Sequence, residues 1–394
     1  MVAGPVRDTP HPKRPHSDRD RLASLRLIRS RRVGPATWHR LIAEHGSAIA
    51  ALEALPEIAR KAGVDRYEPC PEGVVMAEMR AAAAIGARML CHGEAGYPEA
   101  LAEISDAPPV LWLRGRAELL ARPMVALVGA RNASSLGLRM ARRLAESLSE
   151  TGFVVASGLA RGIDAEAHSG ALAGGTVAVL AGGVDHVYPP ENAPLMQRIA
   201  EEGCLLSEQP PGLEAQARHF PLRNRIISGL ARALVVVEAA SRSGSLITAK
   251  EAADQGREVF AVPGHPFDAR AAGCNQLIRE GATLVRSAAD VIEAVGGQIS
   301  GARSPSSGRP MSAHLAAHSV PGGTLPGPAP VRRPLREIAA LHRLILDRLS
   351  PSPGAEDQLI RDLDVPAQEV LPQILQLELE GELRRQPGGL LSRG

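Results

Sequence analysis

Short apolar runs alternate with helical segments between residues 122 and 296, and this alternation constrains the fold more than any other feature. The runs read MVALVGA, GFVVASG, GTVAVLAG, CLLSE, ALVVVEA, EVFAVPG and TLVR in chain order. Runs that are apolar throughout are typical of strands buried on both faces of a parallel sheet. Strands that alternate with helices predict βαβ units. The sequence therefore predicts an α/β fold with an extended Rossmann-like, doubly wound and mostly parallel sheet.

The segments between the predicted strands have helical periodicity. The expected helices are Ser134–Glu150, Ile163–Ala173, Ala193–Glu202, Leu222–Ala231, Ser245–Gln255, Asn275–Glu280 and Ala288–Val295.

The rest of the chain divides by composition. Residues 1–17 are polar and Pro-rich, so we expect them to be disordered. Residues 18–70 predict a small helical N-terminal domain resembling a sterile-alpha-motif or helix-hairpin-helix unit, which could hold a DNA backbone or be a plain interaction module. The Rossmann-like domain is expected over residues 71–296. A Gly/Pro/Ser-rich linker over 297–334 then leads to a tail, 335–394, with the helix and hairpin order of a winged-helix domain.

Composition excludes several classes of protein. The net charge is +2 and aromatic residues make up 2%, so a polycation or a serial base-stacking protein is not expected. A local basic patch exists, because residues 1–40 hold ten Lys or Arg against three Asp. The four cysteines have no CxxC spacing, so no metal site is expected. The absence of a membrane-length apolar run or a secretory h-region favours a cytoplasmic protein without a membrane segment.

Three loops of small residues follow predicted strands, and each contains an arginine. They are Gly129–Gly137 with Arg131, Ser157–Asp164 with Arg161, and Ser241–Thr248 with Arg242. In open parallel sheets, ligands bind outside the carboxyl ends of the strands. Small-residue loops at helix starts let backbone N–H groups approach an anion, and arginine adds a fork suited to phosphate. Three such loops at one edge predict a phosphate-bearing ligand.

The kind of phosphate ligand follows from the motifs that are missing. The chain has neither G-x-G-x-x-G nor G-x-x-x-x-G-K-[ST], so neither a dinucleotide cofactor nor a P-loop ATP site is expected, and we assign no cofactor. Asp164 and His168 could form a catalytic pair, although an acid in a first helical turn more often accepts from N–H groups. A row of phosphate-sized loops suits a nucleic-acid backbone instead. Phe220 could then hold one base or belong to the core.

The stretch FPLRNRIISGL, which begins at Phe220, predicts a helix with cations in its first turn. The helix dipole disfavours Arg223 and Arg225 there unless the turn faces an anion. On a helical wheel Arg223 lies within the apolar arc, so it is as consistent with a buried strut as with a ligand contact. Asn224 lies outside that arc and is the better candidate for contact with DNA, with Arg225 behind it.

Several motifs together resemble the bacterial DNA-processing protein A (DprA/Smf) family. They read VALVGAR, SGLARGIDAEAH, GGVDHVYPPEN, LLSEQPPG, HFPLRNRIISGLA, SGSLITAKEAADQGREVFAVPG and GCNQLIREGA, in that order, between Tyr97 and Val295. The resemblance implies a non-enzymatic protein of natural transformation and competence. Such a protein binds and protects incoming single-stranded DNA, loads a RecA-type recombinase and forms homodimers through the Rossmann domain. The DNA contacts that the resemblance implies are Arg131, Arg218, Phe220, Asn224, Ser243, Gly244 and Ser245.

Two other functions stay open. The stretch SRSGSLITAKE could serve a nucleotide-binding enzyme similar to nucleoside-monophosphate phosphoribohydrolases, with Glu251 as the acid. A purely structural adaptor is the third reading. The tail also departs from a DNA-reading winged helix, because its expected recognition helix, Pro366–Gly381, contains no Lys or Arg. An acidic helix is repelled by phosphates, which favours a partner or regulatory module over duplex DNA binding.

Overall fold

The computed structural model describes residues 17–64, 66–295, 335–349, 354–363, 365–386 and 390–393. The chain forms two compact units, residues 1–297 and 298–394, which are described separately. Residues 1–16 of the N-terminal segment that we expect to be disordered lie outside the described residues, and so does the expected linker over 297–334. The PGG sequence at residues 387–389 also lies outside them.

A single nine-stranded sheet organises the first unit, with the order β1-β2-β6-β5-β4-β3-β7-β8-β9. The strands are β1 (Arg88–Cys91), β2 (Val110–Gly115), β3 (Met124–Val128), β4 (Val154–Ser157), β5 (Thr176–Val179), β6 (Cys204–Ser207), β7 (Ala233–Val236), β8 (Glu258–Ala261) and β9 (Thr283–Leu284). In this spatial order, every neighbouring pair between β6 and β9 is parallel. Strands β1 and β2 extend the sheet beyond β6 with antiparallel pairs. Every residue of β3 to β7 is buried, as the apolar runs predict.

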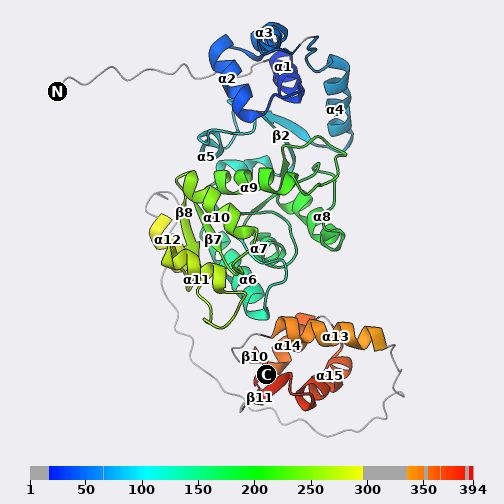
Figure 1. Ribbon diagram of the computed structural model, residues 1–394, viewed down its shortest axis with the longest axis vertical. Coiled ribbons are helices and arrows are strands. Elements are labelled where there is room, and N and C mark those ends of the chain that lie inside the picture. Colours follow the sequence, from blue (N-terminus) through cyan, green and yellow to red (C-terminus); the bar gives the residue numbers. More distant parts are fainter. Residues whose placement is uncertain are drawn as a thin grey trace, which may run out of the picture. The chain divides into compact units, whose positions relative to one another are not determined.

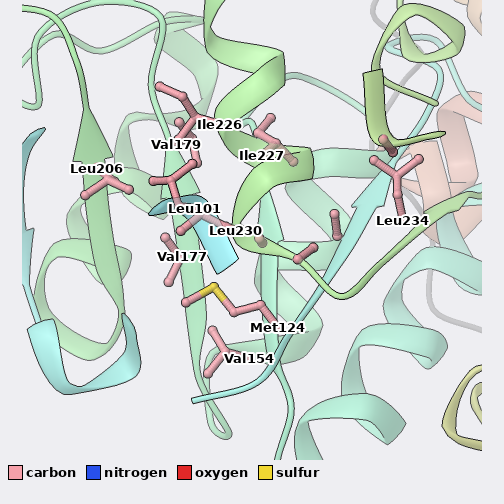
Figure 2. Close-up of a cluster of buried hydrophobic side chains, with 14 of the residues drawn as sticks. Leu101, Met124, Val154, Val177, Val179, Leu206, Ile226, Ile227, Leu230 and Leu234 are labelled. Carbon is pink, nitrogen blue, oxygen red and sulfur yellow. The ribbon is translucent and has the colours of Figure 1, made fainter. Parts of the chain in front are cut away.

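Helices cover both faces of this sheet, so the doubly wound, mostly parallel α/β fold is confirmed (Figure 1). One face contacts α5 (Glu99–Ala102), α9 (His219–Leu230), α10 (Ser245–Asp254) and α11 (Ala272–Arg279); the other contacts α6 (Ser135–Glu150), α7 (Ile163–Ala171), α8 (Ala193–Glu202) and α12 (Ala288–Val295). Short 3₁₀ turns lie at Ala117–Ala121 and Pro190–Asn192. Figure 2 shows Ile226, Ile227 and Leu230 of α9 against Val177 and Val179 of β5. Burial of such side chains contributes roughly 1.5–3 kcal/mol each.

A small helical bundle covers the antiparallel end of the sheet (Figure 1). It consists of α1 (Asp18–Arg29), α2 (Pro35–His45), α3 (Ala48–Lys61) and α4 (Glu72–Ala84). The Ser17 hydroxyl caps α1 by accepting a hydrogen bond from the Asp20 N–H at 3.2 Å. Arg29 of α1 pairs with Glu78 of α4 at 2.8 Å, and Glu78 also accepts from Trp112 Nε1 of β2 at 2.8 Å. This buried chain of bonds ties the bundle to the sheet.

The second unit is a winged helix, as the sequence predicts. It comprises α13 (Leu335–Arg348), β10 (Gly354–Ala355), α14 (Glu356–Leu363), α15 (Ala367–Leu379), β11 (Leu383–Gln386) and β12 (Leu390–Arg393). Pro366 caps α15 and Pro372 lies inside it. Leu371 and Leu375 are exposed on α15, whereas Ile374 is buried in the core of the unit.

One predicted helix start is wrong in a way that affects the site. Helix α9 begins at His219, three residues before the expected Leu222. Pro221 therefore lies in the first turn, where it needs no N–H partner. Arg223 and Arg225 consequently lie in the second turn, beyond the strongest influence of the helix dipole. Their burial, rather than the dipole, determines what they do.

Candidate nucleic-acid interface

A cleft of about 880 Å³ lies at the carboxyl ends of the central strands. Its walls come from the loops after β3, β4, β5, β7 and β8 and from the start of α9, as expected for an open parallel sheet. Of the nine residues that the sequence predicts for DNA contact, six line it: Arg131, Phe220, Asn224, Ser243, Gly244 and Ser245. The tertiary structure thus brings together residues that are up to 114 positions apart in the sequence.

The first loop is held by a buried acid from another strand. Glu238, two residues after the end of β7, accepts a hydrogen bond from the Ser134 N–H at 2.9 Å and from the Ser134 hydroxyl at 2.5 Å. The same hydroxyl caps α6 by accepting from the Gly137 N–H at 3.0 Å. Burial raises the pKa of Glu238, and the hydrogen bonds from Ser134 oppose that shift. These bonds set the position of the loop that carries Arg131.

The second loop, after β4, contacts Arg223 through its backbone. Arg223 Nη1 donates to the carbonyl of Gly158 at 2.5 Å and to that of Val179 at 2.6 Å. Gly158 leaves room for this contact, because an added Cβ would overlap the Arg223 guanidinium and displace it. Burial lowers the pKa of Arg223 to about 10, and the nearby Asp164 carboxylate opposes this shift. Arg223 therefore stays protonated at neutral pH at the floor of the cleft.

Asp164 and His168 of α7 are both buried, and both side chains form hydrogen bonds within the protein. The Asp164 carboxylate accepts from the N–H groups of Gly158 and Ala160 at 3.2 and 3.4 Å. His168 Nε2 accepts from the Leu159 N–H at 3.3 Å, so its Nδ1 carries the proton donated to Thr176 at 2.7 Å. Burial lowers the pKa of His168 to about 3. The pair thus shapes the loop, and His168 does not line the cleft.

Phe220 lies in an aromatic and cationic cluster at one wall. The guanidinium carbon of Arg131 lies 5.2 Å from the centre of the Phe220 ring, and that of Arg223 lies 5.8 Å from it. The ring of Tyr188, in the loop after β5, lies 5.4 Å from Phe220. Arg131 and Tyr188 are exposed, and Phe220 is partly exposed. A planar base can stack on such a ring while an arginine meets its phosphate.

The third loop, after β7, also lines the cleft. The hydroxyls of Ser243 and Ser245 lie 2.7 Å apart, and the Leu246 N–H donates to the Ser243 carbonyl at 3.1 Å. Gly244 leaves open space where a Cβ would stand. Arg242 is exposed and, like Arg131, forms no ion pair with any residue in the described parts of the chain. Two uncompensated arginines on neighbouring loops make the cleft attractive to phosphates.

Three predicted contacts lie elsewhere. Arg161 pairs with Glu191 at 3.3 Å on the surface, and Arg218 Nε donates to His219 Nε2 at 3.4 Å. Arg225 is buried, and its Nη2 donates to both carboxylate oxygens of Glu208, at 2.6 and 2.8 Å. None of the three lines the cleft. Arg225 points away from the cleft, and its bonds to Glu208 connect α9 to the residue that follows β6.

The structure places the acid that the enzymatic alternative requires. Glu251, the expected acid, does not line the cleft. Burial and the Asp106 carboxylate raise its pKa to about 7, and the only cation that opposes this shift is Arg225. Among the residues that the structure describes, no group of three His, Cys, Asp or Glu side chains could hold a metal ion.

Sequence reasoning missed several residues that shape the cleft. Tyr188 and Arg270 line it, and Glu238 positions its first loop. Glu238 follows the apolar run of β7 directly, and a charged residue at the carboxyl end of a buried strand is a usable signal. Tyr188 could have been found in a similar way, because it lies in the loop that follows the apolar run of β5. Arg270 pairs with Asp268 at 3.1 Å, which only the folded loop reveals.

The fold and the cleft together define a Rossmann-like protein with an arginine-lined cleft at the carboxyl edge of its sheet. The sequence model of the family described as DNA recombination-mediator protein A matches residues 88–296. Models for a DprA-like N-terminal HHH domain and a DprA winged helix domain match residues 18–81 and 328–389. The chain belongs to this DprA/Smf family.

Individual relatives agree with this assignment. Protein Smf of Synechocystis is 38% identical over 307 residues, which is 74% of this chain and 76% of that protein. DNA processing protein DprA of Streptococcus pneumoniae is 46% identical over 198 residues, which is 50% of this chain and 70% of that protein. The crystal structure of S. pneumoniae DprA overlaps 69% of this chain and 97% of its own, with a TM-score of 0.59 and 36% identity. In the described residues, no helix is long and apolar enough to span a membrane.

Proposed function

We propose that this protein binds single-stranded DNA in the cleft, protects it and passes it to a RecA-type recombinase during natural transformation. The observation that carries the DNA-binding part is the placement of Arg131 against Phe220, 5.2 Å from the ring, in the cleft that the Ser243–Ser245 loop also lines. One wall can hold a base and both walls can hold phosphates. An unpaired strand suits this arrangement because its bases are free to stack.

The family description supports the remaining parts of the proposal. A recombination mediator hands DNA to another protein, which agrees with a non-catalytic cleft and with binding that does not depend on base sequence. Homodimerisation through the Rossmann domain and a cytoplasmic location are also part of this proposal. We propose no catalytic activity, and release of free base from nucleoside monophosphates by the pure protein would contradict that.

Fluorescence anisotropy with labelled oligonucleotides tests the DNA-binding part. A single strand of about 20 nucleotides should bind more tightly than the matching duplex, and the affinity should fall steeply between about 50 and 200 mM salt. The variant Arg131→Ala should weaken binding about tenfold and lower the slope of log affinity against log salt by about 0.7, because one phosphate contact is lost.

Arg116→Ala is the matched control. Arg116 is an exposed arginine just after β2, at the opposite edge of the sheet, where it pairs with Glu118 at 2.8 Å. Its removal changes the net charge by the same amount and should leave affinity unchanged. Equal affinities for Arg131→Ala and the wild type would show that DNA does not occupy this cleft.

A further inference from the structure

Phe267 is the most exposed large apolar side chain among the described residues, with 88% of its surface accessible. It lies in the loop between β8 and α11, at the same edge of the sheet as the cleft. Covering a phenylalanine ring removes apolar surface from water, so a ligand that packs on Phe267 is bound more tightly. The ring of His265 lies 5.6 Å from it and covers little of its surface.

The loop that holds Phe267 is tightly bonded. Gly264 and Asn275 exchange two hydrogen bonds, at 3.2 and 3.1 Å. Asp268 accepts from the Arg270 N–H at 3.0 Å and pairs with its guanidinium, and the Asp268 N–H donates to the His265 carbonyl at 2.9 Å. The Phe267 N–H donates to His265 Nδ1 at 3.3 Å. The backbone on both sides of the ring is therefore held in place while the ring itself stands in solvent.

This loop continues the wall of the cleft. Arg270 lines the cleft and is three residues from Phe267, so their Cα atoms lie within about 11 Å of each other. The N–H of Gly273, at the start of α11, donates to the carbonyl of Ala239 at 2.8 Å, directly before the loop that carries Arg242. Phe267 thus stands just beyond the β8 end of the cleft, on a loop joined to its wall.

Arginine and aromatic side chains follow one another along the carboxyl edge of the sheet. Phe220 and Tyr188 lie toward β5, Arg131 and Arg242 lie on the loops after β3 and β7, and Phe267 lies after β8. Four strand spacings separate β5 from β8, which is about 19 Å. An extended single strand that crosses the two uncompensated arginines would leave the cleft beside Phe267.

We propose that Phe267 is a second base-stacking residue, which holds a base of the single-stranded DNA where the strand leaves the cleft at β8. This inference rests on the proposed function and adds a contact outside the cleft. A ring carried on a fixed backbone loses less conformational freedom when it binds, which favours stacking. Proximity to two unpaired arginines favours a nucleic acid over an apolar protein surface as the occupant.

A tryptophan at this position reports the contact directly. The two natural tryptophans, Trp38 and Trp112, are 3% and 2% exposed, so their emission should not respond to DNA. In Phe267→Trp, single-stranded DNA should quench the new emission along the same titration curve as the anisotropy of the labelled strand. Binding without any change in emission would overturn the inference and leave the proposed function intact.

A length series supplies the second measurement. With oligonucleotides of about 4 to 16 nucleotides, Phe267→Ala should match the wild type for the shortest strands. It should bind the longer ones about 5- to 100-fold more weakly, the usual effect of one lost stack. Phe267→Tyr should keep the affinity, and Phe267→Leu should lose it, because stacking needs a flat ring.

Phe220→Ala separates the two proposals. It should weaken binding at every length, because Phe220 lies inside the cleft. If Phe220→Ala weakens binding and Phe267→Ala does not at any length, Phe267 is not a contact although the cleft is correct. If the wild type binds no single strand, the proposed function itself is wrong.

Discussion

Arg223 and Arg225 lie two positions apart on α9, and both side chains are buried. Arg223 donates to carbonyls of the β4 and β5 segments at the floor of the cleft. Arg225 faces Glu208 and the carbonyl of Asp106, to which its Nη1 donates at 2.6 Å. The helical wheel places Arg223 in the apolar arc correctly, but it cannot show that Arg225 meets another buried surface on the opposite side.

Arg225→Ala should destabilise the protein without changing the cleft. It leaves the Glu208 carboxylate buried without its cation, and loss of one partner of a buried pair costs roughly 3–5 kcal/mol. Urea unfolding measures this loss, and anisotropy should give the same affinity of the folded fraction for single-stranded DNA. A weaker affinity at unchanged stability would return Arg225 to the DNA-binding set.

His168 should make stability fall in acid. The folded-state pKa of His168 is about 3, whereas its ordinary value is 6.5, so below pH 6.5 the unfolded chain binds a proton that the folded chain does not. Stability is therefore complete above pH 6.5 and declines toward pH 3, by about 2 kcal/mol at pH 5.

Urea unfolding of the wild type and His168→Gln at pH 7.5 and pH 5 checks this. The variant should be less stable at neutral pH, and its loss of stability on acidification should be smaller by about 2 kcal/mol. Identical pH dependence in both proteins would mean that His168 is not buried in its neutral form.

At the scale of elements, the loops after β3 and β4 fit together only because Gly162 has no side chain. Its φ is +75°, and an added Cβ would lie 2.7 Å from the Arg131 carbonyl and closer still to that of Ala130. The Ile163 N–H donates to the Ala130 carbonyl at 3.2 Å across this contact. The position of Arg131 therefore depends on a glycine in another loop.

Gly162→Ala should destabilise the protein and weaken DNA binding together. Gly256→Ala is the matched control, because Gly256 has a similar φ of +70° and open space around it. The control should lose about 1 kcal/mol, the cost of a left-handed backbone. Gly162→Ala should lose at least about 1 kcal/mol more, since overlap adds to that cost. Equal losses in thermal or urea unfolding would show that the loops can move apart freely.

Helix and strand types follow from periodicity in this chain, but some boundaries do not. Helices α8 and α12 have the predicted bounds, because a change of composition marks both ends. Helix α9 begins early, since His219 is buried and extends the first turn. Strands β1 and β2 were not predicted, because they are short and antiparallel and only the four-residue helix α5 lies between them, so they give no βαβ signal.

At the scale of the whole molecule, the chain forms two units with different surfaces. The cleft belongs entirely to residues 1–297. In the second unit, α15 has exposed Leu371 and Leu375 and acidic residues at its end. A helix of this kind repels phosphates, so the second unit should contribute nothing to the affinity for DNA.

A chain that ends at Gly297 should therefore keep its DNA affinity. We expect its affinity for a single strand to lie within about twofold of the full chain, with the same salt dependence, because no phosphate contact is lost. Anisotropy at two salt concentrations measures both. A large loss of affinity in the shortened chain would show that the winged helix binds DNA after all.

The sequence alone determined the class of fold, because continuous apolar runs between helices can be buried only in a parallel sheet with two covered faces. It also determined most of the cleft, since residues after parallel strands necessarily meet at one edge. Only the tertiary structure decided which arginine side chains line that cleft. Arg161 and Arg225 pair with Glu191 and Glu208, which lie in other segments of the chain, and pairing over such distances leaves no trace in local sequence.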